Sequence, residues 1–227
     1  MRILLFANTD WFLWNFKLAL ARGLREAGHQ VTLLSPPGPF GAKLVAEGFH
    51  WEAFELSRSG INPFSELIAV RRLARVYRRL KPDLVHHFTI KCVIYGSFAA
   101  RRAGVAHVVN SITGLGFAML ATTPKARLIR PVVVALYRRA LAATDVIFQN
   151  SDNRDTLFRL GVLARSRVHV IPGDGVDADV FTPPPAREPG YVVLMMCRLL
   201  RAKGVAEYVA AAKRVRETIP AARFLLA

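Results

Sequence analysis

The chain has 227 residues, of which 52% are hydrophobic, and its mean hydropathy of +0.26 excludes an intrinsically disordered protein. The net charge of +16 attracts anionic partners in general, whether nucleic acid, anionic lipid or phosphorylated substrates, although a GC-rich genome, which favours arginine, would account for part of it without any function. No apolar run reaches the roughly 20 residues that cross a bilayer, and two cysteines suggest no disulfide framework, which fits a reduced cytosolic setting.

Apolar runs typical of strands alternate with helical patterns along most of the chain. Strands separated by single helices predict right-handed β-α-β units and a parallel sheet covered by helices on both faces. We therefore expect an α/β, Rossmann-like domain over residues 1–181. Its predicted strands are Arg2–Phe6, Val31–Leu34, Trp51–Glu55, Leu84–Phe88, His107–Asn110, Val146–Gln149 and Val168–Ile171.

Helical spacing predicts which faces the first two helices bury. The first helix is expected to end at Gly28, and the second begins at Pro63 and ends before Lys81. The predicted buried faces are Phe16, Leu20, Leu24 and Ala27 in the first helix, and Leu67, Val70, Ala74 and Tyr77 in the second.

A proline-rich linker over 182–190 separates this domain from a second unit. After it come a predicted strand at Tyr191–Met196, a helix at Val205–Glu217 and the start of a strand at Arg223. One β-α-β unit cannot bury its own apolar faces. We therefore expect residues 191–227 to be the truncated start of a second Rossmann-like domain.

Two short motifs flank the linker and carry charge or backbone freedom. Arg198 and Lys203 lie around the predicted strand-to-helix turn, where both cations can point at a diphosphate, and the helix that begins after Gly204 adds its dipole and free N–H groups. Upstream, Gly175 suits a turn at which backbone approaches a ligand. Taken singly, a solvated basic turn and an ordinary strand-to-linker turn account for the two motifs equally well.

Together these motifs resemble the interdomain hinge and donor-diphosphate site of retaining glycosyltransferases of family 4, which have the GT-B fold. Four further segments resemble a subgroup that includes bacterial N-acetylhexosaminyltransferases acting on undecaprenyl-diphosphate-linked sugars. These segments are Asn8–Phe16, Ser35–Gly41, His86–Lys91 and Asn110–Gly116. The chain departs from the family at Cys197, where the pattern has glycine, and at Asp174, where it has asparagine. It also has an aromatic first loop instead of a glycine-rich one, and Thr113-Gly114 where many relatives carry a histidine.

The resemblance implies an acceptor-binding domain over 1–181 and a truncated donor-binding domain over 191–227. It also implies a metal-independent reaction without a cofactor, and the sequence has no acidic pair or HExxH motif that would indicate a metal site. The implied residues are Asp10 and His87 for catalysis, Arg198, Lys203, Gly204 and Gly175 for the donor diphosphate, and Asn8, Trp11, Lys91, Thr113 and Gly114 on the acceptor side. Strand alternation sends His86 and His87 to opposite faces, so one of them is also explained as a core histidine.

The function that the resemblance implies is transfer of a sugar, with retention, from a UDP-linked nucleotide-sugar to a polyprenyl-diphosphate-linked glycan in cell-surface polysaccharide biosynthesis. We expect the 227 residues alone to be inactive. Two alternatives remain open: a GT-B fold sugar-nucleotide epimerase, and a non-catalytic basic domain that binds membranes.

A membrane surface is the macromolecular partner that the sequence favours. Residues 112–142 mix apolar side chains, among them Phe117, Met119, Leu120 and Val132, with arginines, a composition typical of an interfacial helix on anionic lipid. This predicts a cytoplasmic protein that lies peripherally on the inner face of the plasma membrane. Nucleic acid is not expected, because the arginine clusters fall on separate helices and no binding motif is present.

Overall fold

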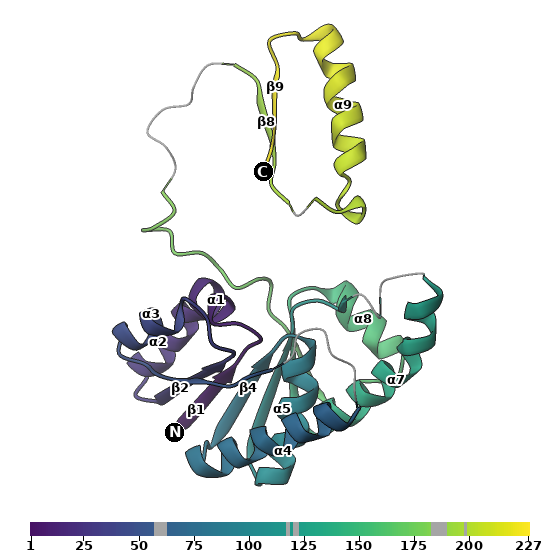
Figure 1. The fold of residues 1–227 in the computed structure, drawn as a ribbon. Coiled ribbons are helices and arrows are strands. Elements are labelled where there is room, and N and C mark those ends of the chain that lie inside the picture. The colour runs from purple at the N-terminus through teal and green to yellow at the C-terminus, as the bar shows by residue number, and fades with distance from the viewer. Residues whose placement is uncertain (57–62, 117–118, 120–122, 183–189, 198) are drawn as a thin grey trace. The chain divides into compact units, whose positions relative to one another are not determined.

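In the computed structural model the chain forms two compact units, Met1–Val176 and Asp177–Ala227. The structure describes residues 1–56, 63–116, 119, 123–182, 190–197 and 199–227 (Figure 1). Most of the predicted linker therefore lies outside the described residues, and so does Arg198. The predicted domain boundaries at 181 and 190 stay predictions.

The first unit contains a seven-stranded parallel sheet in the order β3-β2-β1-β4-β5-β6-β7 (Figure 1). The predicted strands all form, and no strand end differs from the prediction by more than two residues. Strand order reverses between β1 and its neighbour β4, the kind of position at which open α/β sheets bind ligands. The strands are β1 Arg2–Phe6, β2 Gln30–Ser35, β3 His50–Ala53, β4 Leu84–Phe88, β5 His107–Ile112, β6 Asp145–Phe148 and β7 Arg167–Val170.

Helices cover both faces of this sheet, as predicted. Leu4 and Phe6 of β1 pack in the cluster that holds α4 and α5, whereas Ile3 and Leu5 point the other way, into the cluster that holds α2 and α3. This alternation is what a strand buried on both faces requires. The helices are α1 Asp10–Phe12, the π-helical η1 Leu13–Lys17, α2 Leu18–Glu26, α3 Gly41–Ala46, α4 Pro63–Leu80, α5 Ile90–Ala103, α7 Pro124–Leu141 and α8 Ser151–Arg159.

The face that the first helical segment buries differs from the predicted one. Phe16 and Leu20 are 43% and 37% exposed, while Leu13, Lys17 and Ala21 are buried. The π-helical turn Leu13–Lys17 is wider than an α-helical turn, so it moves the buried stripe by one position. Lys17 therefore faces inward, and Phe16 lies on the exposed side of the segment.

The second predicted helix is largely as expected. Within α4, Val70, Ala74 and Tyr77 are buried, but Leu67 is 42% exposed. Leu67 lies in the first turns of the helix beside Phe64 and Ile68, which are exposed as well. The N-terminal end of α4 thus presents an apolar surface instead of packing on the sheet.

The second unit is the predicted β-α-β unit. It consists of the parallel strands β8 Val192–Met195 and β9 Arg223–Leu226, the short 3-10 helix η2 Arg201–Lys203 and α9 Val205–Thr218. The Tyr208 hydroxyl on α9 lies 2.9 Å from the carbonyl oxygen of Val193 and 2.8 Å from that of Leu225, which ties the helix to both strands. Five apolar side chains nevertheless remain 41–57% exposed: Val192, Val193 and Leu194 of β8, and Leu225 and Leu226 of β9.

Candidate functional site

The structure gathers the predicted acceptor-side residues at the carboxyl edge of the first unit's sheet. Asn8 and Trp11 follow β1, Lys91 follows β4, and Thr113 and Gly114 follow β5. Trp11 is 47% exposed and packs edge-on against Phe16 at 5.4 Å between ring centroids. Since these residues flank the point at which strand order reverses, the edge is the candidate binding site.

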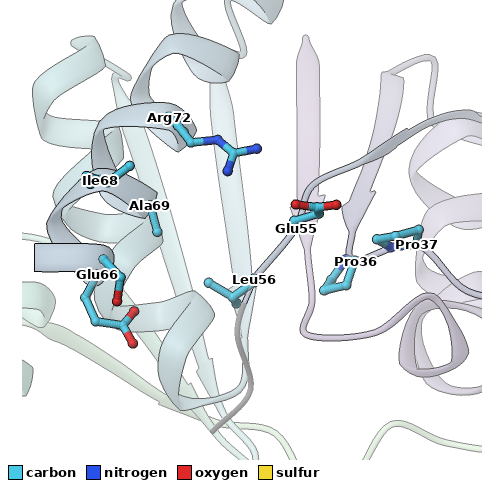
Figure 2. Close-up of a pocket in the computed structure, with 9 residues that line it drawn as sticks. Pro36, Pro37, Glu55, Leu56, Glu66, Ile68, Ala69 and Arg72 are labelled. Carbon is cyan, nitrogen blue, oxygen red and sulfur yellow. The ribbon is translucent and has the colours of Figure 1, made fainter. Parts of the chain in front are cut away.

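A groove opens at the same edge, beside α4. It has a volume of about 510 Å³ and is lined by residues that follow β2 and β3 and by the first turns of α4. Figure 2 shows α4 on one side and Pro36, Pro37 and Glu55 on the other. Glu66, on its wall, accepts a 3.0 Å hydrogen bond from the Lys91 ammonium. The groove is thereby joined to a predicted acceptor-side residue.

Asp10, predicted as a catalytic residue, is engaged in the protein's own structure. Its carboxylate accepts backbone N–H bonds from Trp11 at 2.8 Å, Phe40 at 2.6 Å and Gly41 at 2.9 Å, and the residue is only 3% exposed. Gly38 passes so close that a Cβ there would lie 2.3 Å from Oδ1. The carboxylate thus fixes the start of α3 against the loop after β1. It does not face the solvent of the cleft.

His87, the other predicted catalytic residue, lies fully buried in the core. Its Nδ1–H donates to Asn110 Oδ1 at 2.9 Å, and its Nε2 accepts from the Tyr77 hydroxyl at 3.1 Å. The tautomer follows from the network, because Asn110 uses its amide nitrogen to donate to Thr144 Oγ1 and its oxygen to accept from Ser97. Burial lowers the pKa of His87 to about 4. His87 is therefore a neutral core residue in this structure, and its predicted catalytic role stays a prediction.

His86 points to the opposite face of β4, as strand alternation predicts. Its Nε2 lies 2.7 Å from Ser111 Oγ, and its ring lies 4.2 Å from that of Phe88. Burial is the main cause that lowers the pKa of His86 to about 3, and electrostatic interactions with the His87 ring and with Lys17 act in the same direction. His86 is therefore neutral near pH 7.

Lys17 is the residue at this edge that the sequence reasoning missed. Its Nζ lies 4.5 Å from the centroid of the Phe88 ring and 5.5 Å from that of Phe12, and it is paired with Asp174. The available signal was its spacing, four residues after Leu13 and four before Ala21, both of which are buried. A buried ammonium at the end of β4 is a charge that can recognise an anion.

The predicted donor-diphosphate residues are distributed over both units. Lys203 closes η2 and is exposed, and Gly204, with φ of +78°, forms the N-cap of α9. Gly175 has φ of +73° and open space around its Cα, in the segment after β7. Arg198 lies outside the described residues. The turn at Lys203 and Gly204 thus has the predicted form, a cation followed directly by a helix start.

The described residues include neither a candidate metal cluster nor a candidate membrane span. Within those residues, no group of three or more His, Cys, Asp or Glu side chains is placed to hold a metal ion. Over the same part of the chain, no helix combines the length and the apolar character needed to cross a bilayer.

Comparison with known proteins assigns the family. The family described as glycosyl transferase 4-like matches residues 2–151. The chain belongs to this family. It is 26% identical, over 96% of its length, to the N,N'-diacetylbacillosaminyl-diphospho-undecaprenol alpha-1,3-N-acetylgalactosaminyltransferase of Campylobacter jejuni. The chain spans 61% of the length of that curated relative.

Solved structures share the fold of this glycosyl transferase 4-like chain. Anabaena Alr3699/HepE, in complex with UDP and glucose, has a TM-score of 0.69 and 19% identity, with 98% of this chain and 60% of that one covered. The UDP-GlcNAc 2-epimerase of Neisseria meningitidis, bound to UDP-GlcNAc, has a TM-score of 0.64 and 13% identity, with 100% and 65% covered. At these identities the likeness concerns the fold alone, which this chain shares with HepE and with a UDP-GlcNAc 2-epimerase.

Proposed function

We propose that this chain supplies the acceptor-binding domain of a retaining glycosyltransferase, which moves a sugar from a UDP-linked donor to a polyprenyl-diphosphate-linked glycan in cell-surface polysaccharide biosynthesis. One observation carries the proposal. The relative from Campylobacter, whose name states a diphospho-undecaprenol substrate, is similar along 96% of this chain. The groove and the polar residues at the carboxyl edge are consistent with that proposal, because they offer an acceptor glycan both a cavity and charged partners.

The reaction needs stabilisation of the leaving diphosphate more than it needs a strong base. Bond formation between the acceptor oxygen and the anomeric carbon accompanies cleavage of the bond from that carbon to the β-phosphate oxygen. We assign Lys203 and Arg198 to the charge that develops on the diphosphate, together with the start of α9 at Gly204. Since Asp10 and His87 are held in buried hydrogen bonds, the proton of the acceptor hydroxyl goes to the departing phosphate.

The test is a transfer assay with the product of the whole gene. It is incubated with UDP-N-acetylhexosamines and a short-chain polyprenyl-diphosphate sugar, and NMR gives the anomeric configuration of the lipid-linked product. Lys203→Ala should lower kcat/KM by about 10²–10³, as loss of one group that stabilises transition-state charge does. Lys213→Ala removes another exposed cation of the same unit, from α9, and should leave the rate unchanged. Equal rates for the two variants would reject the assignment of Lys203.

The epimerase alternative is distinguished by the same mixture without acceptor. This alternative is tested because the chain shares its fold with a UDP-GlcNAc 2-epimerase. An epimerase would release an epimerised UDP-sugar in the absence of any lipid. A transferase would leave the UDP-sugar intact under that condition and consume it only when the acceptor is added.

A lipid-linked acceptor also leads us to propose that the protein lies peripherally on the cytoplasmic face of an anionic membrane. The predicted interfacial segment is only partly suited to this role, because Met119 is buried in the core and Phe117 and Leu120 lie outside the described residues. On α7, Leu128 and Val132 are exposed. The start of α4 is the stronger candidate surface, since it exposes Phe64, Leu67 and Ile68 and continues into the exposed arginines Arg71, Arg75 and Arg78.

A further inference from the structure

Lys17 is a buried cation to which the proposed reaction assigns no role. Its side chain is only 5% exposed, and its Nζ lies over the face of Phe88. It comes from the helical segment after β1 and touches β4, and these are the two strands between which strand order reverses. Ligands of open α/β sheets bind outside the carboxyl ends of the strands at such a point. The charge is therefore placed where a ligand is expected.

A buried ammonium requires a counter-charge, because desolvation is costly unless the ion is paired. Lys17 finds it in Asp174, 157 residues further along the chain. Asp174 is not part of the core. Its side chain is 22% exposed, and it lies in the segment between Ile171 and Val176, whose residues are all exposed. The counter-charge thus belongs to a surface segment, whereas the cation belongs to the folded body.

The backbone around Asp174 suits a segment that changes its path. Gly173 and Gly175 on either side have φ of +68° and +73°, a region that residues with side chains avoid. Before them, the Ile171 N–H donates to the Phe148 carbonyl at 2.8 Å, which continues the pairing of β6 and β7. Beyond Ile171, the pair with Lys17 holds the segment against the carboxyl edge. Release of Asp174 would return its carboxylate to water at small cost, since the segment is already solvated.

We propose that Lys17 marks an anion-binding position at the reversal point of the sheet, which Asp174 occupies in the free chain and which a diphosphate oxygen occupies in the substrate complex. The identity of the natural ligand rests on the proposed function, in which donor and acceptor both carry a diphosphate. Asp174 is then an internal competitor. A diphosphate displaces it because it brings more negative charge to the same ammonium. His86, nearby, stays neutral and does not compete for the anion.

The competition gives a signature that a purely structural ion pair lacks. If the paired form makes up about 90% of the free chain, the apparent affinity for an anion is reduced about tenfold, and Asp174→Asn removes this reduction. Binding of inorganic pyrophosphate to the 227-residue chain, measured by calorimetry, should therefore tighten about tenfold in Asp174→Asn. Lys17→Met should weaken this binding to what Lys203 and Arg198 contribute, and Lys17→Arg should keep it.

Glu47→Gln is the matched control. It removes one negative charge and releases Arg22 from an ion pair in which the Glu47 side chain is 27% exposed, close to the value for Asp174. Glu47 directly follows α3, and α2 lies between it and Lys17 in the sequence. Its pyrophosphate affinity should equal that of the unaltered chain. A tenfold gain here as well would show that general charge, and not Lys17, attracts the anion.

Amide chemical shifts measured by NMR provide the second measurement. Pyrophosphate should shift the amide signals of residues 173–176 in the unaltered chain, because Asp174 is released, and should leave those of Asp174→Asn unchanged. UDP and farnesyl diphosphate replace pyrophosphate in two further arms. The ligand whose binding tightens in Asp174→Asn identifies the donor or the acceptor as the source of the diphosphate.

The proposal is overturned if Asp174→Asn binds pyrophosphate no more tightly than the unaltered chain, or if a folded Lys17→Met binds it equally well. Should Lys17→Met fail to fold, the comparison of Asp174→Asn with Glu47→Gln decides alone. Pyrophosphate binding requires no sugar transfer. Failure of the anion position therefore leaves the transfer assay untouched, and failure of the transfer assay leaves this result standing.

Discussion

Acidification should destabilise the first unit through its buried histidine. His87 is enclosed and hydrogen-bonded as a neutral ring, and its pKa of about 4 lies below the ordinary value of 6.5 that it regains on unfolding. The unfolded chain therefore binds the proton more readily than the folded one. The contribution of His87 to stability is complete above pH 6.5, and it falls as the pH drops from 6.5 towards 4.

The size of the effect follows from these two pKa values. Between pH 7.5 and pH 5, proton binding by the unfolded chain favours unfolding by roughly 2 kcal/mol, because one pKa unit corresponds to about 1.4 kcal/mol. His86, with a pKa of about 3, adds to the loss in the same direction. A fall of this size is a large part of the roughly 5–15 kcal/mol that stabilises a typical domain.

Urea unfolding followed by tryptophan fluorescence is the measurement. The three tryptophans are Trp11, Trp14 and Trp51, and all of them belong to the first unit, so the signal reports that unit. In His87→Gln the free energy of unfolding should change with pH by about 2 kcal/mol less than in the unaltered chain over this range. His107→Gln, at an exposed position on the neighbouring strand, should keep the full dependence.

Two results would refute this reasoning. One is a free energy of unfolding that stays constant between pH 7.5 and pH 5 in the unaltered chain. The other is an equal flattening in His87→Gln and His107→Gln. Either would mean that His87 is already protonated, or already accessible to water, in the folded protein.

Three further outcomes can be checked on the same chain. Gly96→Ala should lower the free energy of unfolding by about 1–3 kcal/mol, because its Cβ would lie 2.5 Å from the His87 ring. Gly23→Ala, in α2 with open space around it, should raise the free energy of unfolding by about 1 kcal/mol. Thermal or urea unfolding measures both changes. The chain should sediment with phosphatidylglycerol vesicles and much less with neutral vesicles, and this difference should shrink as salt screens the arginines. The double variant Phe64→Ser with Ile68→Ser should weaken this sedimentation more than Leu128→Ser with Val132→Ser. Equal losses in the two double variants would argue against the α4 surface. Backbone amides of β8 should exchange hydrogen faster than those of β1, because β8 is exposed and β1 is buried; equal protection measured by mass spectrometry would contradict this.

The sheet could be predicted from the sequence because parallel strands buried on both faces consist of short continuous apolar runs, as in Arg2–Phe6. The turn at Lys203 and Gly204 could be predicted for a similar reason, because a glycine directly before a helical pattern indicates a turn, and Gly204 has the positive φ that favours glycine. Both features depend on neighbouring residues only. Their prediction needed no knowledge of distant contacts.

The π-helical turn and the roles of the polar residues were not accessible in this way. The apolar series that begins at Phe16 led to the expectation that Phe16, and not Lys17, lies in the core, and the π-helical turn was not predicted. Alternation showed that His86 and His87 point apart, but the partners that make His87 a core residue lie 10 and 23 positions away. Asp10 likewise depends on backbone N–H groups about 30 positions further on.

The close approach of Gly96 to His87 has a consequence for the evolution of the family. A side chain at position 96 and an imidazole at position 87 occupy the same space, since a Cβ at 96 would lie 2.5 Å from the ring. The same exclusion holds between Gly38 and the Asp10 carboxylate, at 2.3 Å. Among homologous sequences a side chain at position 96 should therefore occur only with a residue other than histidine at position 87, and one at position 38 only with a residue other than aspartate at position 10. Retention of His87 or Asp10 across relatives would then reflect shared volume with a glycine, and it would not by itself indicate that either residue takes part in catalysis.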